Sequence, residues 1–348
     1  MKKIVGILLV LSMLCLSLAG CGASTTSNKQ VSDKPTGKEQ ETTKTYKIKV
    51  ANILAADHPE TLAFNKFKEL VETKSEGKIK VEVYPNCQLG SSETYIDSMR
   101  QGAIEITSPG TVMAQLQPLV ATPEMPLLFR DWDHVKKTLT GPLAEEMTKG
   151  MVEKLGVRHL GFAPISFRVI TSNFEIKKFE DLKGMRLRVP NIPFYIEFAK
   201  GVGANPIAMA FSELFTGLEQ KVVDGQENPY ATIKANKFYE VQPYILDSRH
   251  IFTVHGWYIN EKFYQSLPEK YQKIVADSAK EAIEYCYEIS IKAEEEAIQF
   301  LKDKGIKIHF PDETFKEKLK ESQKDVREFF YKQYPGSKEL AEKIEKVQ

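Results

Sequence analysis

The distribution of arginine is the first chemical signal in this sequence. The chain contains 8 Arg and 40 Lys, yet Arg168, Arg186 and Arg188 fall within 21 residues. Arginine carries a planar, permanently charged fork that binds a carboxylate through two parallel hydrogen bonds, which lysine cannot do. Arg186 and Arg188 are two apart on a strand-like segment, so they share one strand face. We expect one to contact a ligand and the other to form a structural ion pair; ordinary surface ion pairs for all three are the alternative.

A second polar group, Asp224-Gly225-Gln226-Glu227-Asn228-Pro229, follows a predicted helix. Such a composition is typical of a solvated turn. Asn228 precedes a proline, which favours an extended backbone and leaves its side-chain amide able to donate to a ligand oxygen. We therefore predict a loop whose Asn228 side chain contributes to a binding site.

Signatures of common enzymes are absent from the sequence: it has no G-x-S-x-G elbow, P-loop, G-x-G-x-x-G or H-E-x-x-H. His250 and His255 are the one close histidine pair, but their spacing places them on opposite faces of a strand, so we predict no metal site. Cys87 and His58 are conceivable as a nucleophile and a base, but an ordinary buried thiol is the simpler interpretation. We predict a protein that is not an enzyme and needs no cofactor.

The elements that must position these residues belong to a mixed α/β fold. Residues 46–50 and 79–83 alternate apolar and polar side chains, the period of a half-buried strand, and an amphipathic helix at about 59–74 lies between them. Strand, helix and strand in about 40 residues form a βαβ unit. The pattern further predicts a helix from Ser91–Ser92 to Gln101, a strand at 103–107, two short strands within 161–172, a strand at 185–189 and a helix that begins at Ser212.

One long helix is predicted in the last third of the chain, from Pro268 to about Asp303, with no Gly or Pro inside it and Gly305 as its stop. At a rise of 1.5 Å per residue it would be about 50 Å long, more than one ordinary domain needs. Its apolar positions drift around the helix instead of holding a heptad. We predict that it connects two lobes; a surface helix on one lobe is the alternative.

The first 21 residues have the features of an export signal. Two lysines precede an apolar run from Ile4 to Leu18, which is too short to span a bilayer. The run ends in Leu18-Ala19-Gly20-Cys21, which resembles the bacterial lipoprotein lipobox and implies cleavage before Cys21 and lipidation of its sulfur; a plain signal peptide is the alternative. We predict a signal at residues 1–20 and, from its polar composition, a flexible tether at 21–45.

The overall composition excludes some classes without identifying a ligand. The chain has 348 residues, with 48 Lys+Arg against 47 Asp+Glu and a net charge of +1. This balance lacks the basic face of a nucleic-acid-binding protein, and loss of the signal with its two lysines changes the net charge to −1. Cys87 and Cys286 would remain after lipidation of Cys21; whether they pair stays open, and they are too few for a structural zinc site.

Several separated motifs resemble the DctP-type solute-binding proteins of TRAP (tripartite ATP-independent periplasmic) transporters, from about residue 46 to the C-terminus. Cys87 stands in one of them where a glycine is more usual. In chain order the motifs are Asp57-His58-Pro59, residues 77–81 (GKIKV), 84–90 (YPNCQLG), 184–190 (GMRLRVP), 203–206 (GANP), 210–215 (AFSELF), 223–229 (VDGQENP) and 237–242 (KFYEVQ).

The resemblance implies a two-lobed α/β fold of the periplasmic-binding-protein type, with hinge strands and a long C-terminal helix crossing both lobes. We expect lobe I at 46–165 plus 255–293 and lobe II at 166–254 plus 294–348. An organic acid would bind between the closing lobes and pass to small and large membrane subunits, with the receptor anchored by lipid on the outer face of the cytoplasmic membrane.

The resemblance also implies roles for particular residues. Arg188 would hold the ligand carboxylate, Arg168 and Asn228 would assist, and Phe211 would pack on the ligand's apolar face. Further residues lie in segments that line the cleft in the family: Asn191, His58, Glu93, Ser108 and Tyr230.

The identity of the acid stays open at this point. Ser108 stands where sialic-acid-binding members carry a glutamate, which argues against sialate and leaves C4-dicarboxylates, sugar acids and 2-oxo or 2-hydroxy acids. His58 and Glu93 would suit a hydroxylated ligand and favour sugar acids. A receptor that presents its ligand to a sensor kinase and a surface-anchored hydrolase are the alternative functions.

Overall fold

The computed structural model describes residues 44–348, which form one compact unit. The predicted signal, the predicted lipidation site Cys21 and nearly all of the predicted tether lie outside the described residues. Within residues 44–348, no helix is long and apolar enough to cross a membrane.

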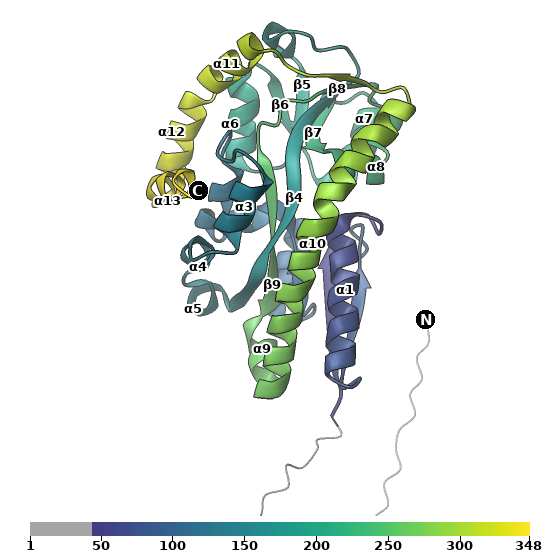
Figure 1. The fold of residues 1–348 in the computed structure, drawn as a ribbon, viewed down its shortest axis with the longest axis vertical. Coiled ribbons are helices and arrows are strands. Elements are labelled where there is room, and N and C mark those ends of the chain that lie inside the picture. Colours follow the sequence, from purple (N-terminus) through teal and green to yellow (C-terminus); the bar gives the residue numbers. More distant parts are fainter. Residues whose placement is uncertain (1–43) are drawn as a thin grey trace, which may run out of the picture. The chain divides into compact units, whose positions relative to one another are not determined.

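A mixed sheet is the centre of the fold (Figure 1), and it consists of two groups of strands. Strand β4 belongs to both groups, because it pairs with β9 up to Phe167 and with β7 from Arg168 onward. The first group runs β2 (Ile79–Tyr84), β1 (Tyr46–Asn52), β3 (Ile106–Ser108), β9 (Phe252–Asn260) and β4 (Val157–Ser172). The second group continues from β4 through β7 (Gly225–Pro229), β5 (Arg186–Val189) and β6 (Asn205–Ala208). On the other edge of β4, β8 (Tyr244–Leu246) pairs with β4, and β10 (Lys307–His309) pairs with β8.

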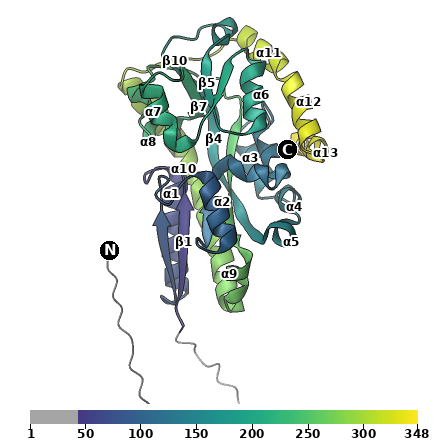
Figure 2. The ribbon, with the colours of Figure 1, turned by 180° about the vertical axis from the view of Figure 1, so that it is seen from behind.

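Helices cover both faces of the first group of strands. Helix α1 (Pro59–Lys74) and the long α10 (Glu269–Asp303) lie side by side on one face (Figure 1), and α2 (Ser92–Gln101) lies on the other (Figure 2). The βαβ unit is confirmed, since β1 and β2 are parallel with α1 between them. The predicted caps also form, because Ser91 accepts a hydrogen bond from the Thr94 N–H at the start of α2.

Helix α10 connects the two groups of strands, as predicted from its length. Its first half buries Val275, Ala282 and Cys286 in the larger hydrophobic core. Ala297 and Leu301, in its second half, lie in a second core with residues of α8 (Tyr230–Ala235). The predicted two-lobed α/β fold with a long helix crossing both lobes is therefore confirmed.

The remaining helices surround these strands. Near the C-terminus, α12 (Lys324–Gln333) packs on α6 (Pro193–Gly201) (Figure 1), and α13 (Ser337–Glu345) packs on the 3-10 helix η2 (Pro118–Glu124). Their bounds are α3 (Trp132–Leu139), α4 (Leu143–Thr148), α5 (Met151–Leu155), α6 (Pro193–Gly201), α7 (Leu214–Glu219), α8 (Tyr230–Ala235), α9 (Glu261–Ser266), α11 (Glu313–Ser322), α12 (Lys324–Gln333), α13 (Ser337–Glu345), and the 3-10 helices η1 (Gly110–Gln115), η2 (Pro118–Glu124), η3 (Phe179–Leu182), η4 (Phe211–Glu213) and η5 (Phe238–Glu240).

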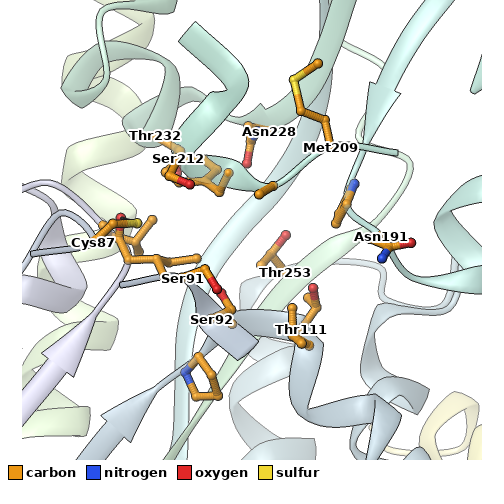
Figure 3. Close-up of a pocket in the computed structure, with 18 of the residues that line it drawn as sticks. Cys87, Ser91, Ser92, Thr111, Asn191, Met209, Ser212, Asn228, Thr232 and Thr253 are labelled. Atoms are coloured by element: carbon orange, nitrogen blue, oxygen red, sulfur yellow. Dashed lines mark hydrogen bonds between the residues drawn. The ribbon is translucent and has the colours of Figure 1, made fainter. Parts of the chain in front are cut away.

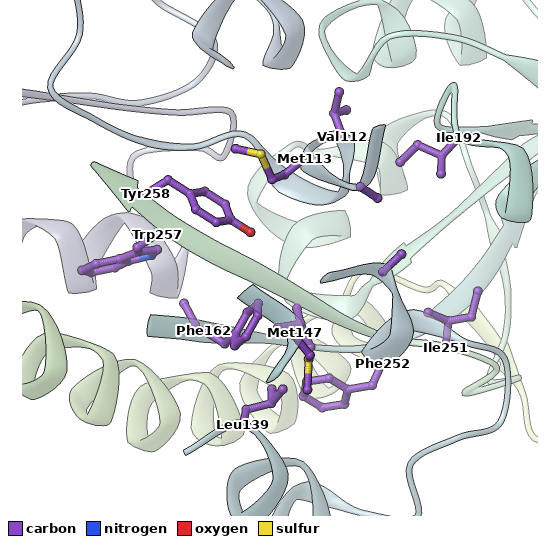
Figure 4. Packing of buried hydrophobic residues seen from close by; sticks show 14 of the residues in the cluster. Val112, Met113, Leu139, Met147, Phe162, Ile192, Ile251, Phe252, Trp257 and Tyr258 are labelled. Carbon is purple, nitrogen blue, oxygen red and sulfur yellow. The ribbon is translucent and has the colours of Figure 1, made fainter. Parts of the chain in front are cut away.

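The larger core is built around β4 and β9. Trp257 stacks on Phe64 of α1 at 3.7 Å between ring centroids, and Figure 4 shows Trp257 and Tyr258 on opposite faces of β9, as neighbours in a strand must be. Phe252 contributes from the start of the same strand. This packing fixes β9, which carries two of the polar side chains described below.

Three sequence predictions are wrong in detail. The two short strands expected within 161–172 are one strand, β4, because Gly161 and Pro164 lie at irregularities of its pairing with β9 and do not end it. The strand expected at 103–107 is β3 (Ile106–Ser108), which is shorter and begins later in the chain. The polar loop expected at 224–229 is instead the buried strand β7, whose carboxylate finds its partner on β4.

Candidate binding site

A cavity of about 290 Å³ lies between the two groups of strands. Figure 3 shows Ser91, Ser92 and Thr111 on one side of it and Ser212, Asn228 and Met209 on the other. Six side chains with hydroxyl groups line its wall: Ser91, Ser92, Thr111, Ser212, Thr232 and Thr253. Charged, amide and imidazole side chains also line it: Arg168, Arg188, Glu93, Glu213, Asn191, Asn228 and His255.

Arg188 is a buried cation in the cavity wall. It is 2% exposed, and its Nε and Nη2 donate to the Met209 carbonyl at 3.1 and 2.7 Å, since parallel pairing of β5 with β6 brings that carbonyl beside the guanidinium. No carboxylate of residues 44–348 lies within 4 Å of it. Burial lowers the pKa of Arg188 to about 10. The guanidinium therefore lacks the anion that a buried cation requires.

Arg168, in contrast, has its anion already. Its Nη2 donates to Glu227 Oε1 at 2.8 Å and its Nε to the second carboxylate oxygen, because antiparallel pairing of β4 with β7 places the two side chains together. Burial opposes the charge, but the Glu227 carboxylate raises the pKa of Arg168 above its ordinary value. His250 Nε2 lies 3.3 Å from Glu227, and burial lowers the pKa of this histidine. The pair is therefore electrically neutral toward the cavity.

Arg168 also orients Asn228. The Asn228 Oδ1 accepts from Arg168 Nη2 at 3.2 Å, and the Asn228 Nδ2 donates to Gln226. One amide hydrogen of Asn228 is left for another acceptor, as an amide nitrogen carries two. On the same side, the Phe211 ring lies 6.0 Å from the Arg188 Cζ and forms an apolar boundary beside the cation.

Six of the nine ligand-contact residues expected from the sequence line this cavity. They are Arg188, Arg168, Asn228, Phe211, Asn191 and Glu93. Of Arg186 and Arg188, one was expected to form a structural ion pair. Arg186 does so, with Asp224 at the surface.

The other three expected contacts, His58, Ser108 and Tyr230, do not line the cavity. His58 caps α1 through its Nδ1, and Ser108 donates to Glu60 at 2.6 Å. Tyr230 begins α8 and is buried in the smaller core. Ser108 and Tyr230 are next in the chain to Pro109 and Pro229, which line the cavity, and all three side chains are buried. These placements correct the expectation that the three side chains reach the cavity.

Thr253 and His255 line the cavity and were missed by the sequence analysis, which considered His255 only as a metal ligand. Both lie on β9, two residues apart, so they share a face. The alternation of Thr253 and His255 within an otherwise apolar strand is the signal that could have identified them. Among the described residues no cluster of metal-ligating side chains exists.

The two cysteines of the described chain are free thiols, which settles the open question of pairing. Cys286 lies on the buried face of α10, while Cys87 lines the cavity. Cys87 has φ +57°, in the left-handed region that favours glycine, which accounts for glycine as the usual residue of that motif. Burial raises the pKa of the Cys87 thiol to about 11, so it is uncharged at neutral pH.

Comparison with known proteins agrees with this geometry. The family model described as "Bacterial extracellular solute-binding protein, family 7" (DctP) matches residues 50–333. The 2,3-diketo-L-gulonate-binding periplasmic protein of Escherichia coli is 30% identical over 291 residues, 82% of this chain and 88% of that protein. The C4-dicarboxylate-binding protein of Bacillus subtilis is 32% identical over 273 residues, 78% of this chain and 77% of that protein.

Solved structures extend the similarity to the whole fold. A TRAP periplasmic solute-binding protein from Haemophilus influenzae with bound L-gulonate superposes with a TM-score of 0.83 at 37% identity, covering 87% of this chain and 100% of that one. A sugar-acid-binding protein from Advenella mimigardefordensis in complex with galactonate has a TM-score of 0.84 at 33% identity, covering 87% and 98%. The chain belongs to the DctP family of extracytoplasmic TRAP solute-binding proteins.

Proposed function

We propose that the protein captures a sugar acid in the 290 Å³ cavity and delivers it to the membrane subunits of a TRAP transporter. The observation that carries this proposal is Arg188, a buried guanidinium facing the cavity with no carboxylate partner among residues 44–348. A ligand carboxylate would supply the missing charge, and the planar fork suits it geometrically.

The count of unpaired charges favours one carboxylate over two. Arg168 also faces the cavity, but Glu227 neutralises it, so Arg188 is the cation that needs a ligand anion. Glu93 and Glu213 lie in the cavity wall and would repel a second carboxylate placed near them. A C4-dicarboxylate is therefore less well matched than a monocarboxylate.

The rest of the wall suits a ligand with many hydroxyl groups. Ser91, Ser92, Thr111 and Thr232 provide hydroxyl groups, which both donate and accept, and the Asn191 amide adds both functions. Solved relatives contain bound gulonate, galactonate, galacturonate or glucuronate, whereas others contain succinate, orotic acid or sn-glycerol-3-phosphate. Four of these seven ligands are sugar acids, which supports that class without selecting one member.

Binding would be coupled to movement of the lobes. We propose the boundaries expected from the sequence, with β4, β9 and α10 as connections. The pairing of β4 changes from β9 to β7 between Phe167 and Arg168, close to the proposed boundary at 165/166. Arg188 on β5, Asn228 on β7 and Phe211 on η4 lie on one side of the cavity. Ser91 and Ser92 at the start of α2 and Thr111 on η1 lie on the other side, so a ligand touching both sides would favour the closed state.

We further propose export and anchoring by lipid on Cys21 at the outer face of the cytoplasmic membrane. The lipobox-like residues Leu18–Cys21 support this. A Cys21→Ser variant should leave the membrane fraction of the host while retaining ligand binding; an unchanged distribution would contradict the anchor.

The function is tested with a thermal-shift screen of residues 44–348 against sugar acids, C4-dicarboxylates and 2-oxo acids. A ligand that binds only the folded state raises the melting temperature by mass action. We expect a sugar acid to give the largest shift and to be recovered chemically unchanged, which separates a receptor from a hydrolase. A larger shift with succinate than with any sugar acid would overturn the proposed ligand class.

A further inference from the structure

A buried carboxylate, Glu60, lies behind the cavity wall and accepts three side-chain hydrogen bonds. Glu60 is in the first turn of α1 and is fully buried. Its donors are Ser108 Oγ at 2.6 Å, Trp257 Nε1 at 3.1 Å and His255 Nδ1 at 2.9 Å. Burial by itself would raise the pKa of Glu60, but His255 and Ser108 lower it below its usual value. The carboxylate is therefore ionised, and it acts only as an acceptor.

This arrangement determines how the His255 ring presents itself to the cavity. Because ionised Glu60 only accepts, the hydrogen between them is on His255 Nδ1. The ring lines the cavity, and none of residues 44–348 hydrogen-bonds to its Nε2. The neighbour on that side is Gly110 with φ +67°, where an added Cβ would lie 3.3 Å from Nε2. The absence of a side chain at 110 keeps this side of the ring open.

Other buried histidines use both ring nitrogens. His58 bonds to the Glu60 N–H and to Thr232 Oγ1, His134 to the Arg130 N–H and the Ile344 carbonyl, and His250 to Ser248 Oγ and Glu227. The half-buried His159 also has an Nε2 without a hydrogen-bond partner in the described chain, but its ring lies against Phe162 and Tyr258 and does not line the cavity. His255 is thus held on one side and left unpaired on the side that faces the cavity.

We propose that His255 Nε2 hydrogen-bonds a hydroxyl group of the ligand, with Glu60 as the residue that positions the ring. This inference rests on the proposed function, and it names a specificity determinant within the same site. His255 belongs to the first group of strands and Arg188 to the second. A ligand held at its carboxylate by Arg188 and at a hydroxyl by His255 is bound by polar contacts to both groups, whereas an acid with a bare hydrocarbon chain has no group that can hydrogen-bond to His255.

The matched test is His255→Asn against His309→Asn, with L-gulonate and galactonate as probes in isothermal titration calorimetry. The shorter asparagine still donates to Glu60 but does not replace Nε2. His309 lies on β10, outside the cavity wall, and serves as the control. We expect His255→Asn to weaken binding of the better probe about tenfold, the effect of losing one hydrogen bond, and His309→Asn to leave it unchanged.

Each outcome has a defined consequence. Equal affinity of His255→Asn and the wild type would overturn the role of His255 and leave the proposed function standing. Failure of the wild type to bind either probe while it binds succinate would contradict the proposed ligand class and the inference with it. If His255→Asn does not fold, the wild type decides: the His255 Nε2 resonance in a long-range ¹H–¹⁵N spectrum must move when gulonate is added, and an unmoved resonance overturns the inference.

The positioning role of Glu60 has its own readout. Glutamine at position 60 can donate as well as accept, so Glu60→Gln removes the requirement for hydrogen on His255 Nδ1. We expect the ¹⁵N shifts of His255 in the ligand-free variant to report a mixture of the two tautomers, and gulonate binding to weaken severalfold. An unchanged Nδ1–H tautomer together with unchanged affinity would show that Glu60 does not position the ring.

Discussion

Replacing Arg188 by methionine should make the ligand-free protein more stable while it abolishes acid binding. Methionine has a similar unbranched length but no charge, so it fills the space of the Arg188 stem. In the ligand-free protein the guanidinium is buried without a carboxylate partner among residues 44–348, and burial lowers its pKa to about 10. The substitution removes this uncompensated charge, at the cost of the two hydrogen bonds that Arg188 donates to the Met209 carbonyl.

The magnitude follows from the pKa. A fall from 12.5 to about 10 corresponds to a cost on the order of 3 kcal/mol. For a base with a lowered folded-state pKa, this cost is fully present below about pH 10 and disappears as the pH rises toward 12.5. The variant also loses both hydrogen bonds to the Met209 carbonyl, worth about 1 to 2 kcal/mol. We expect a net gain of about 1 to 2 kcal/mol, or about 3 °C in melting temperature.

The assay is urea denaturation and thermal unfolding, each with and without the best ligand of the screen. The variant should bind at least about 100-fold more weakly, because the ligand carboxylate would lose a charge-assisted bidentate contact. Arg186→Met is the matched control: its guanidinium is half-exposed and paired with Asp224, so it should change stability by less than about 1 kcal/mol and leave binding intact. An Arg188→Met variant that keeps its ligand-induced shift, or that is clearly less stable than the wild type without ligand, would refute the reasoning.

Three further results are expected. Arg188→Lys should not restore binding, because an ammonium cannot reproduce the fork; a full ligand-induced thermal shift would contradict this. Glu227→Gln should lower the free energy of unfolding by about 3 kcal/mol in urea, since it leaves the Arg168 charge buried without its partner, and a loss under 1 kcal/mol would show that the pair is unimportant. Glu124 is buried, which raises its pKa to about 7, so its contribution to stability falls as the pH rises from about 4.5 to 7. Relative to the wild type, Glu124→Gln should gain on the order of 2 to 3 kcal/mol between pH 5 and pH 8, and equal pH profiles would refute this.

Much of the local structure could be predicted from residue patterns. The helix at 59–74, the capped helix up to Gln101 and the long helix ending at Asp303 follow from apolar spacing, capping residues and the positions of Gly and Pro. Glycine and proline misled the prediction of β4, because irregularities in its pairing with β9 accommodate both residues, and only the sheet shows this. Gly225–Pro229 has the composition of a turn but is the buried strand β7, since the Glu227 carboxylate is neutralised by Arg168 of β4.

The sequence by itself determined the family, the long connecting helix and the choice of arginine over lysine near the site. Only the tertiary structure decided which arginine needs a ligand. Arg168 and Glu227 are 59 residues apart and become partners through strand register, whereas Arg188 gains no such partner within residues 44–348. Likewise, His255 is oriented by Glu60, 195 residues away in the chain. The net charge that a site offers its ligand depends on which buried ions are already paired. That pairing is set by contacts between residues far apart in the chain, which local sequence patterns do not reveal.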